Sequence, residues 1–130
     1  AASDVYKRQL YVELQNDAIV GTAILNHLQG DEYTGAPWQI AADEDHVLVM
    51  HTLVIDPAAK GHGLGTAFAQ FYERTAREQG CTALRIDTNA RNIPARTLYN
   101  KLGYREVTIV PCQFNGIDGV ELVLLEKAVE

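Results

Sequence analysis

The first part of the chain alternates apolar and polar residues with the period of a half-buried strand. Leu10, Val12 and Leu14 alternate with more polar neighbours up to Gln15, a period of two that predicts a strand. Asn16-Asp17 supplies turn residues, and Ile19 to Leu28 predicts a second strand, so that the two strands form a hairpin.

The next segment, Gly30 to Asp45, contains Gly, Pro and acidic residues and has no repeat. We expect a long loop here, and loops of this length in compact domains usually serve a function or move. His46 to Ile55 is almost continuously apolar and ends at Asp56-Pro57, which predicts a central strand covered on both faces.

Two later segments show helical spacing. Leu64 to Ala76 places apolar residues three and four positions apart, and Gly80 is a suitable C-terminal cap. Asn92-Ile93-Pro94 opens a second helix that Gly103 closes. Strands are predicted between and after these helices, at Ala83 to Thr88, Tyr104 to Pro111 and Val120 to Lys127, the last two joined across residues 115–119.

Residues 1–9, AASDVYKRQ, show no clear periodicity, and the regular pattern starts at Leu10. We therefore expect this segment to be an artefact of cloning or sequence assembly and leave it out of the fold. Residues 10–130 are expected to form a single domain, because the chain is long enough for one compact core and too short for two. The order of elements predicts a mixed α/β layer.

Charge and composition argue against several classes of partner. Lys and Arg number 11 against 17 Asp and Glu, a formal charge of −6, whereas nucleic-acid surfaces are basic. The longest apolar run falls short of the roughly 20 residues that span a bilayer. Cys81 and Cys112 show neither a disulfide framework nor the spacing of metal ligands. We expect a cytoplasmic protein with no metal, nucleic-acid or membrane partner.

A glycine-rich turn, Lys60-Gly61-His62-Gly63-Leu64-Gly65, joins the central strand to the first helix. Glycine permits positive φ and close approach of a ligand, and successive N–H groups at a helix start form an anion site. Thr66 stands where a dinucleotide-binding turn needs glycine, and no Gly-Lys-Ser/Thr ends the turn as in a nucleoside-triphosphate loop. Taken alone, the turn indicates a phosphate site or a tight turn without ligand.

The turn resembles the acetyl-CoA signature of the GNAT family of N-acetyltransferases, Gln/Arg-x-x-Gly-x-Gly/Ala, with Lys60 in place of Gln or Arg. Residues 51–57 resemble the strand that leads into this signature. Residues 92–104 resemble the family block Asn-x-x-Ala-x-x-x-Tyr-x-x-x-Gly-Phe/Tyr. The resemblance therefore extends from Leu10 to the C-terminus and rests on two blocks at family spacing.

The family resemblance implies a mixed, mostly antiparallel sheet flanked by helices, with a helix on each face and central strands that splay to admit an acyl chain. Members usually begin with a strand and two helices that help to wall the amine site. In this chain residues 1–9 stand in that place, so we expect the N-terminal strand and helices to be missing.

Acetyl-CoA is the cofactor that the resemblance implies. The backbone at residues 53–55 would face the pantetheine arm, and the glycine turn would hold the pyrophosphate. Asn92 matches a cofactor-contacting position, although a helix cap explains it equally well. The implied cofactor-binding residues are Leu53, Val54, Ile55, Lys60, Gly61, His62, Gly63, Leu64, Gly65, Thr66, Asn92 and Tyr99.

Two residues are the candidates for catalysis. Tyr99 matches the general acid of the family, and a phenol with a pKa of about 10 can protonate a departing thiolate. An amine must lose a proton before it attacks, and His51 on the central strand has a suitable pKa for that work, although a buried, hydrogen-bonded structural histidine is the better expectation. Asp87 could orient His51 or position the substrate, and could equally pair with Arg85 or Arg91. Glu44 and Asp45 are closer to the loop, where solvated charges explain them.

The predicted function is direct transfer of acetyl from acetyl-CoA to a primary amine of a small molecule or peptide. The alternative is a non-catalytic acyl-CoA-binding or sensor module that has lost its acceptor chemistry. A third reading, an interaction domain whose glycine turn binds nothing, is disfavoured by Tyr99 and Asn92 together. Trp38 and Tyr33 in the long loop could line an acceptor pocket, although anchoring of the loop is the better expectation for Trp38. A homodimer is possible, since the family often pairs through its late strands.

Overall fold

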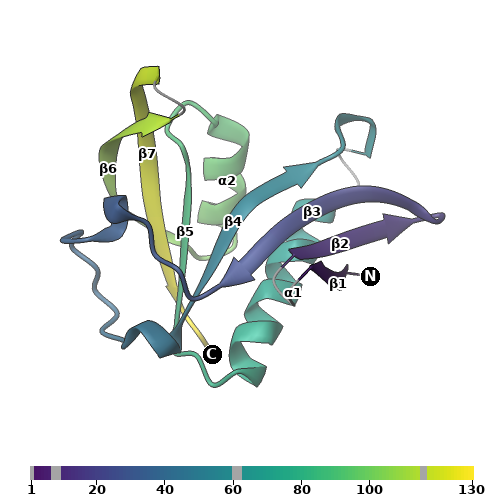
Figure 1. Ribbon diagram of the computed structural model, residues 1–130, viewed down its shortest axis with the longest axis horizontal. Helices are drawn as coiled ribbons and strands as arrows, with labels where there is room; N and C mark the ends of the chain where they lie inside the picture. Colours follow the sequence, from purple (N-terminus) through teal and green to yellow (C-terminus); the bar gives the residue numbers. More distant parts are fainter. Residues whose placement is uncertain (1, 7–9, 60–62, 115–116) are drawn as a thin grey trace.

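The structure is a computed structural model that describes residues 2–6, 10–59, 63–114 and 117–130. Its strands form one sheet in the order β1-β2-β3-β4-β5-β7-β6 (Figure 1). The strands are β1 (Ala2–Tyr6), β2 (Leu10–Gln15), β3 (Ala18–Asn26), β4 (Val47–Ile55), β5 (Ala83–Asn89), β6 (Arg105–Phe114) and β7 (Ile117–Ala128). The helices are α1 (Leu64–Glu78) and α2 (Ile93–Lys101), with short 3₁₀ turns at Asp31–Tyr33, Glu44–His46 and Pro57–Ala59.

The N-terminal segment differs from the expectation. A strand was not expected before Leu10, but β1 pairs antiparallel with β2 and places Ala2 opposite Glu13. The physical reason is that β2 would otherwise be an edge strand, whose free N–H and C=O groups pair with any extended segment alongside. That residues 1–9 are an artefact of cloning or assembly stays a prediction.

The hairpins follow the turn chemistry of the sequence. Asn16 and Asp17 both adopt positive φ, 52° and 64°, as a tight turn between β2 and β3 requires. The last hairpin is longer than predicted, because β7 already begins at Ile117. Gly119, with φ of 86°, lies where the register of β6 and β7 shifts. Asp118-Gly119 therefore belongs to a β-bulge and not to the turn.

Both helices pack on one face of the sheet, which corrects the expectation of a helix on each face. Leu48 and Met50 of β4 share one buried cluster with Phe68 of α1 and Tyr99 of α2. Residues 47 and 49, which alternate with them, face a second cluster covered by the segment between β3 and β4. Figure 1 shows this segment on the side opposite the helices. Neither described helix has the length and apolar character needed to cross a membrane.

Candidate functional site

A gap opens between the two central strands. Parallel pairing of β4 with β5 runs from Val47 opposite Ala83 to Met50 opposite Ile86 and then stops, although both strands continue. On its other side, β4 pairs with β3, and the register shifts so that β4 has one extra residue between His51 and Val54. Such a bulge bends a strand and increases its twist. The two strands diverge beyond this point (Figure 1).

The gap forms the floor of a cleft with a volume of about 690 Å³. Its walls come from the ends of β4 and β5, the start of α1 and the inner face of α2. The lining residues are Leu53, Ile55, Ala59, Gly63, Leu64, Gly65, Thr66, Asp87, Thr88, Asn92, Pro94, Ala95, Leu98 and Tyr99. The cleft thus brings together most of the cofactor-binding residues that the sequence predicted, with an apolar end on β4 and polar groups on β5 and α2.

The N-terminus of α1 opens into this cleft, and the backbone N–H groups of its first three residues have no acceptor among the described residues. Gly63 is the N-cap, with φ of 72°, and no side chain that the structure describes caps the helix. The first N–H groups of a helix have no partner within it, and the helix dipole adds positive potential there. Gly65 allows close packing of the two helices, because a Cβ at this position would lie 2.7 Å from Leu98 Cδ2. This geometry suits an anion; the predicted contacts Lys60, Gly61 and His62 lie outside the described residues.

Helix α2 supplies two of the predicted residues. Asn92 is its N-cap, and the side-chain oxygen accepts a hydrogen bond of 3.2 Å from the Ala95 N–H. The capping role is therefore present, and Asn92 also lines the cleft. Tyr99 is 4% exposed and packs edge-on against Tyr104.

The Tyr99 hydroxyl is suited to donate a proton. It has no hydrogen-bond partner among the residues that the structure describes. Burial, and after it the negative charge of Asp87, raise the pKa of Tyr99 to about 12. The phenol consequently stays protonated at neutral pH and faces the cleft as a donor.

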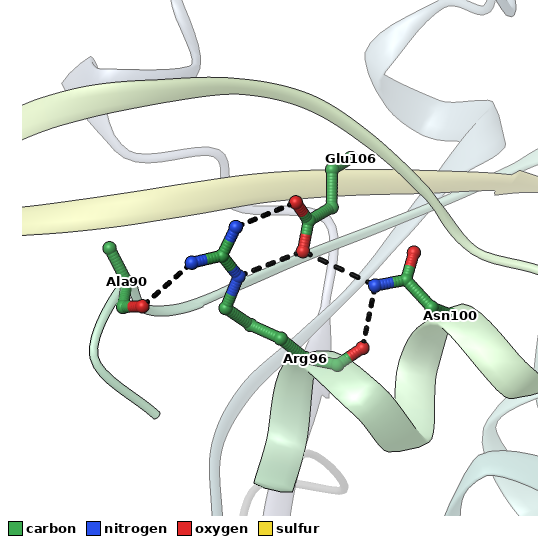
Figure 2. Close-up of polar contacts among 4 residues, drawn as sticks. All are labelled: Ala90, Arg96, Asn100 and Glu106. Atoms are coloured by element: carbon green, nitrogen blue, oxygen red, sulfur yellow. Dashed lines mark hydrogen bonds and ion pairs between the residues drawn. The ribbon is translucent and has the colours of Figure 1, made fainter. Parts of the chain in front are cut away.

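An ion-pair network fixes α2 against the sheet (Figure 2). Arg96 donates from Nε and from one terminal nitrogen to the two carboxylate oxygens of Glu106 on β6, at 2.9 and 2.8 Å. Its other terminal nitrogen donates to the Ala90 carbonyl at 2.8 Å, just before the helix. Asn100 adds a contact to Glu106. The orientation of α2, and so of Tyr99, depends on this bidentate pair.

His51 is part-buried and lies outside the cleft lining. Its Nε2 is 2.7 Å from Asn26 Oδ1 on β3. Burial lowers the pKa of His51, although the charge of Asp87 opposes this effect. The imidazole is therefore neutral at pH 7 and is held by β3, next to the β4 bulge.

Asp87 lies in the cleft, and a residue of the long loop holds it. The Tyr33 hydroxyl donates a hydrogen bond of 2.7 Å to Asp87 Oδ2. Burial raises the pKa of Asp87, whereas the bond from Tyr33 lowers it. Arg85 does not pair with Asp87; its guanidinium stacks over Trp38 and donates to Gln29. The sequence indicated both Tyr33 and Asp87 separately, but residues this far apart give no local signal of their contact.

The remaining candidates have structural positions. Glu44 and Asp45 lie exposed on a 3₁₀ turn. Cys81 and Cys112 are free thiols. Burial raises the pKa of Cys81, and a hydrogen bond to Glu32 raises the pKa of Cys112, so neither is a thiolate at neutral pH. Among the described residues, no group of three His, Cys, Asp or Glu side chains is placed to hold a metal ion.

Comparison with protein-family models identifies this arrangement. The model of the acetyltransferase (GNAT) family matches residues 3–104, which run from β1 to the end of α2. The chain belongs to the GNAT family. Acetyl-CoA is the acyl donor of this family, and the free helix start beside a strand gap fits such a ligand.

Relatives agree with this assignment. Streptothricin acetyltransferase of Escherichia coli is 27% identical over 90 residues, which cover 69% of this chain and 48% of that protein. The chain thus spans about half the length of this curated relative. Nourseothricin acetyltransferase shares the fold with a TM-score of 0.74 at 20% identity, over 93% of this chain and 65% of that one. The yncA structure from Salmonella typhimurium, with its cofactor acetyl-CoA, gives a TM-score of 0.71 at 18% identity, over 93% and 64%.

Proposed function

We propose that this chain is the catalytic part of an N-acetyltransferase that moves an acetyl group from acetyl-CoA directly to a primary amine. One observation carries the proposal: the uncapped start of α1 and the hydroxyl of Tyr99 face the same cleft, which lies where β4 and β5 separate. A helix start suited to an anion and a proton donor are thus combined around one cleft of about 690 Å³.

The binding roles follow from the walls of the cleft. The N–H groups of Leu64, Gly65 and Thr66 would hold the pyrophosphate, together with Lys60, Gly61 and His62 of the same turn. The backbone of residues 53–55 would pair with the pantetheine arm, because β4 has no ladder partner in β5 beyond Met50 within the described strands. Val54 contributes backbone only, since its side chain is exposed. Asn92 is left with its amide NH₂ to donate to the cofactor.

Catalysis needs a polarised carbonyl, a proton for the leaving sulfur and a neutral amine. Acetyl-CoA supplies the thioester that is attacked. The free N–H groups of β4 near the bulge would donate to the carbonyl oxygen as charge develops on it. The Tyr99 hydroxyl would give its proton to the sulfur that leaves.

The amine proton requires an acceptor on the other side. Asp87 lines the cleft with Tyr99, so its carboxylate attracts the ammonium form and lies on the route of the proton. His51, neutral at pH 7, remains the candidate final acceptor, because it lies close enough to Asp87 for their charges to interact. Because direct attack leaves no acyl group on the protein, the two protonated thiols have no role in the reaction.

The acceptor is a small-molecule or peptide amine that carries positive charge. The carboxylate at the cleft and the formal charge of −6 favour a cation. A relative by sequence is named for streptothricin and a neighbour by fold for the alanine of ribosomal protein S18, and the two names cover both acceptor types. A cytoplasmic location and a homodimer formed through the late strands belong to the same proposal.

The test is a CoA-release assay with acetyl-CoA and a panel of amines: polyamines, amino acids, streptothricin and peptides with a free N-terminal alanine. We expect turnover with at least one cationic amine and acetylation of that amine by mass spectrometry. Binding of acetyl-CoA without turnover on any acceptor would instead support the acyl-CoA sensor. Absence of binding would contradict both.

A further inference from the structure

Tyr33 is unusually buried for a residue of the long loop. It is 3% exposed, whereas its neighbours Thr34 and Gly35 are exposed. Its ring packs on the loop-covered face of the sheet, against a cluster that includes Val47 and Leu124. The loop thus brings one aromatic side chain down to the central strands.

Several contacts fix this part of the loop. The Trp38 Nε1–H donates to the Tyr33 carbonyl at 3.0 Å, and the two rings lie 5.4 Å apart. Arg85 of β5 stacks over Trp38 at 4.2 Å. Glu126, buried on β7, accepts hydrogen bonds from the N–H groups of Gln39 and Ile40. The position of the Tyr33 ring is therefore set by the sheet and not by the loop alone.

The last of these contacts is the hydrogen bond that the Tyr33 hydroxyl donates to Asp87 Oδ2. A hydroxyl is a neutral donor, so it directs the carboxylate without cancelling its charge. The nearest cation on the same strand, Arg85, is turned away towards Trp38 and Gln29. Oδ1 of Asp87 has no hydrogen bond to a described residue and is left for a ligand.

We propose that Tyr33 is a positioning residue that aims the Asp87 carboxylate at the amine acceptor. This inference rests on the proposed acetyltransferase function. It adds a role for the long loop, which reaches the reaction through one hydrogen bond.

The proposal predicts a change in the pH dependence. Removing the Tyr33 hydroxyl removes a bond that favours the ionised carboxylate, so the pKa of Asp87 should rise. The other titratable groups that face Asp87 are Glu32 from the loop, His51 of β4, Tyr99 of α2 and Cys112 of β6. These groups are unchanged in Tyr33→Phe, so the shift reports the single bond.

The experiment compares kcat/KM against pH for the wild type and Tyr33→Phe. We expect the acid limb of the Phe variant to move to higher pH, with kcat/KM reduced most at the acid end. Carbon-13 NMR of the Asp87 carboxyl in the ligand-free protein should show the same upward shift in pKa. Trp38→Phe, which removes the bond to the Tyr33 carbonyl, is expected to give a smaller shift in the same direction.

Tyr72→Phe is the matched control. The Tyr72 hydroxyl donates to the carbonyls of Leu48 and Arg85 on the helix face of the sheet, so its loss should lower the unfolding midpoint without moving the acid limb. An active wild type with the same acid limb and the same Asp87 pKa in Tyr33→Phe would overturn the inference. An inactive wild type would overturn the proposed function, and the NMR titration would still decide whether Tyr33 tunes Asp87.

Discussion

Tyr99 joins a buried ring to a hydroxyl that has no hydrogen-bond partner among the described residues, and the residue lines the cleft. The ring is held by Tyr104 and the inner face of α2, so its position does not depend on the cofactor. At the residue scale, the proposed proton donor, the Tyr99 hydroxyl, is thus already in position before the cofactor binds.

Replacing Tyr99 with Phe should lower kcat by about 10²–10⁴-fold, the usual contribution of a general acid, while the Kd for acetyl-CoA stays unchanged. Because the pKa of Tyr99 is about 12, the wild type should show no loss of activity from this group up to about pH 10. Steady-state kinetics over this range measures both effects. Unchanged kcat in the variant would remove Tyr99 from the mechanism.

Asp87→Asn should make the protein more stable at pH 7 and less active. The folded-state pKa of Asp87 is raised by burial, so the folded protein loses stability as pH rises through that pKa and the group ionises. Asparagine does not ionise, so the variant does not lose this folding stability as pH rises. The thermal unfolding midpoints of the wild type and of Asp87→Asn should therefore differ more as pH rises towards neutrality, and should agree below about pH 4. If Asp87→Asn were less stable than the wild type at pH 7, the folded protein would favour the ionised Asp87 carboxylate, which would contradict this prediction.

Some of these residues were visible in the sequence and some were not. Gly63, Asn92 and Tyr99 lie in local blocks whose spacing is set by single turns and helices, and all three line the cleft. The pairing of Tyr33 with Asp87 joins residues 54 positions apart and depends on how the loop lies on the sheet. Periodicity carries no information on such a contact.

At the scale of elements, α2 carries both the acid and a cleft wall, and its anchor is Arg96. Arg96→Lys retains the charge but loses the planar two-point contact with Glu106. We expect the unfolding midpoint to fall by a few degrees and kcat to fall more than the affinity for acetyl-CoA, because Tyr99 is displaced. Arg91→Lys, an exposed change just before the same helix, is the control and should alter neither quantity. Equal kcat in both variants would show that α2 does not need this anchor.

The elements themselves were largely predictable, with instructive exceptions. The two helices and the strands from Leu10 onward follow from apolar spacing and turn residues. That both helices pack on one face could not be predicted from β4, because residues 47–50 are all apolar and such a strand does not reveal which face takes a helix. Gly119 was read as part of a turn, since glycine serves a turn and a bulge equally well.

At the scale of the whole molecule, the site is a product of sheet geometry. The cleft exists because β4 leaves β5 after Met50 and carries an extra residue against β3. No single residue encodes this separation, and only the family resemblance predicted it. The start of α1 faces the cleft because only a short connection, which includes the 3₁₀ turn Pro57–Ala59, separates β4 from α1, so the strand gap and the helix terminus arise from one stretch of chain.

The most direct test of the account is isothermal titration of acetyl-CoA into the wild type, Gly63→Glu and Gly80→Glu. Gly63 and Gly80 lie at opposite ends of α1, with φ of 72° and 76°, and a Cβ at either would meet no atom of the described residues within 4 Å. Both variants therefore carry the same backbone strain and the same added charge. We predict binding by the wild type and Gly80→Glu, and affinity at least about tenfold weaker, or ~1.4 kcal/mol, in Gly63→Glu. Equal binding by all three proteins, or none by the wild type, would contradict a pyrophosphate site at the start of α1.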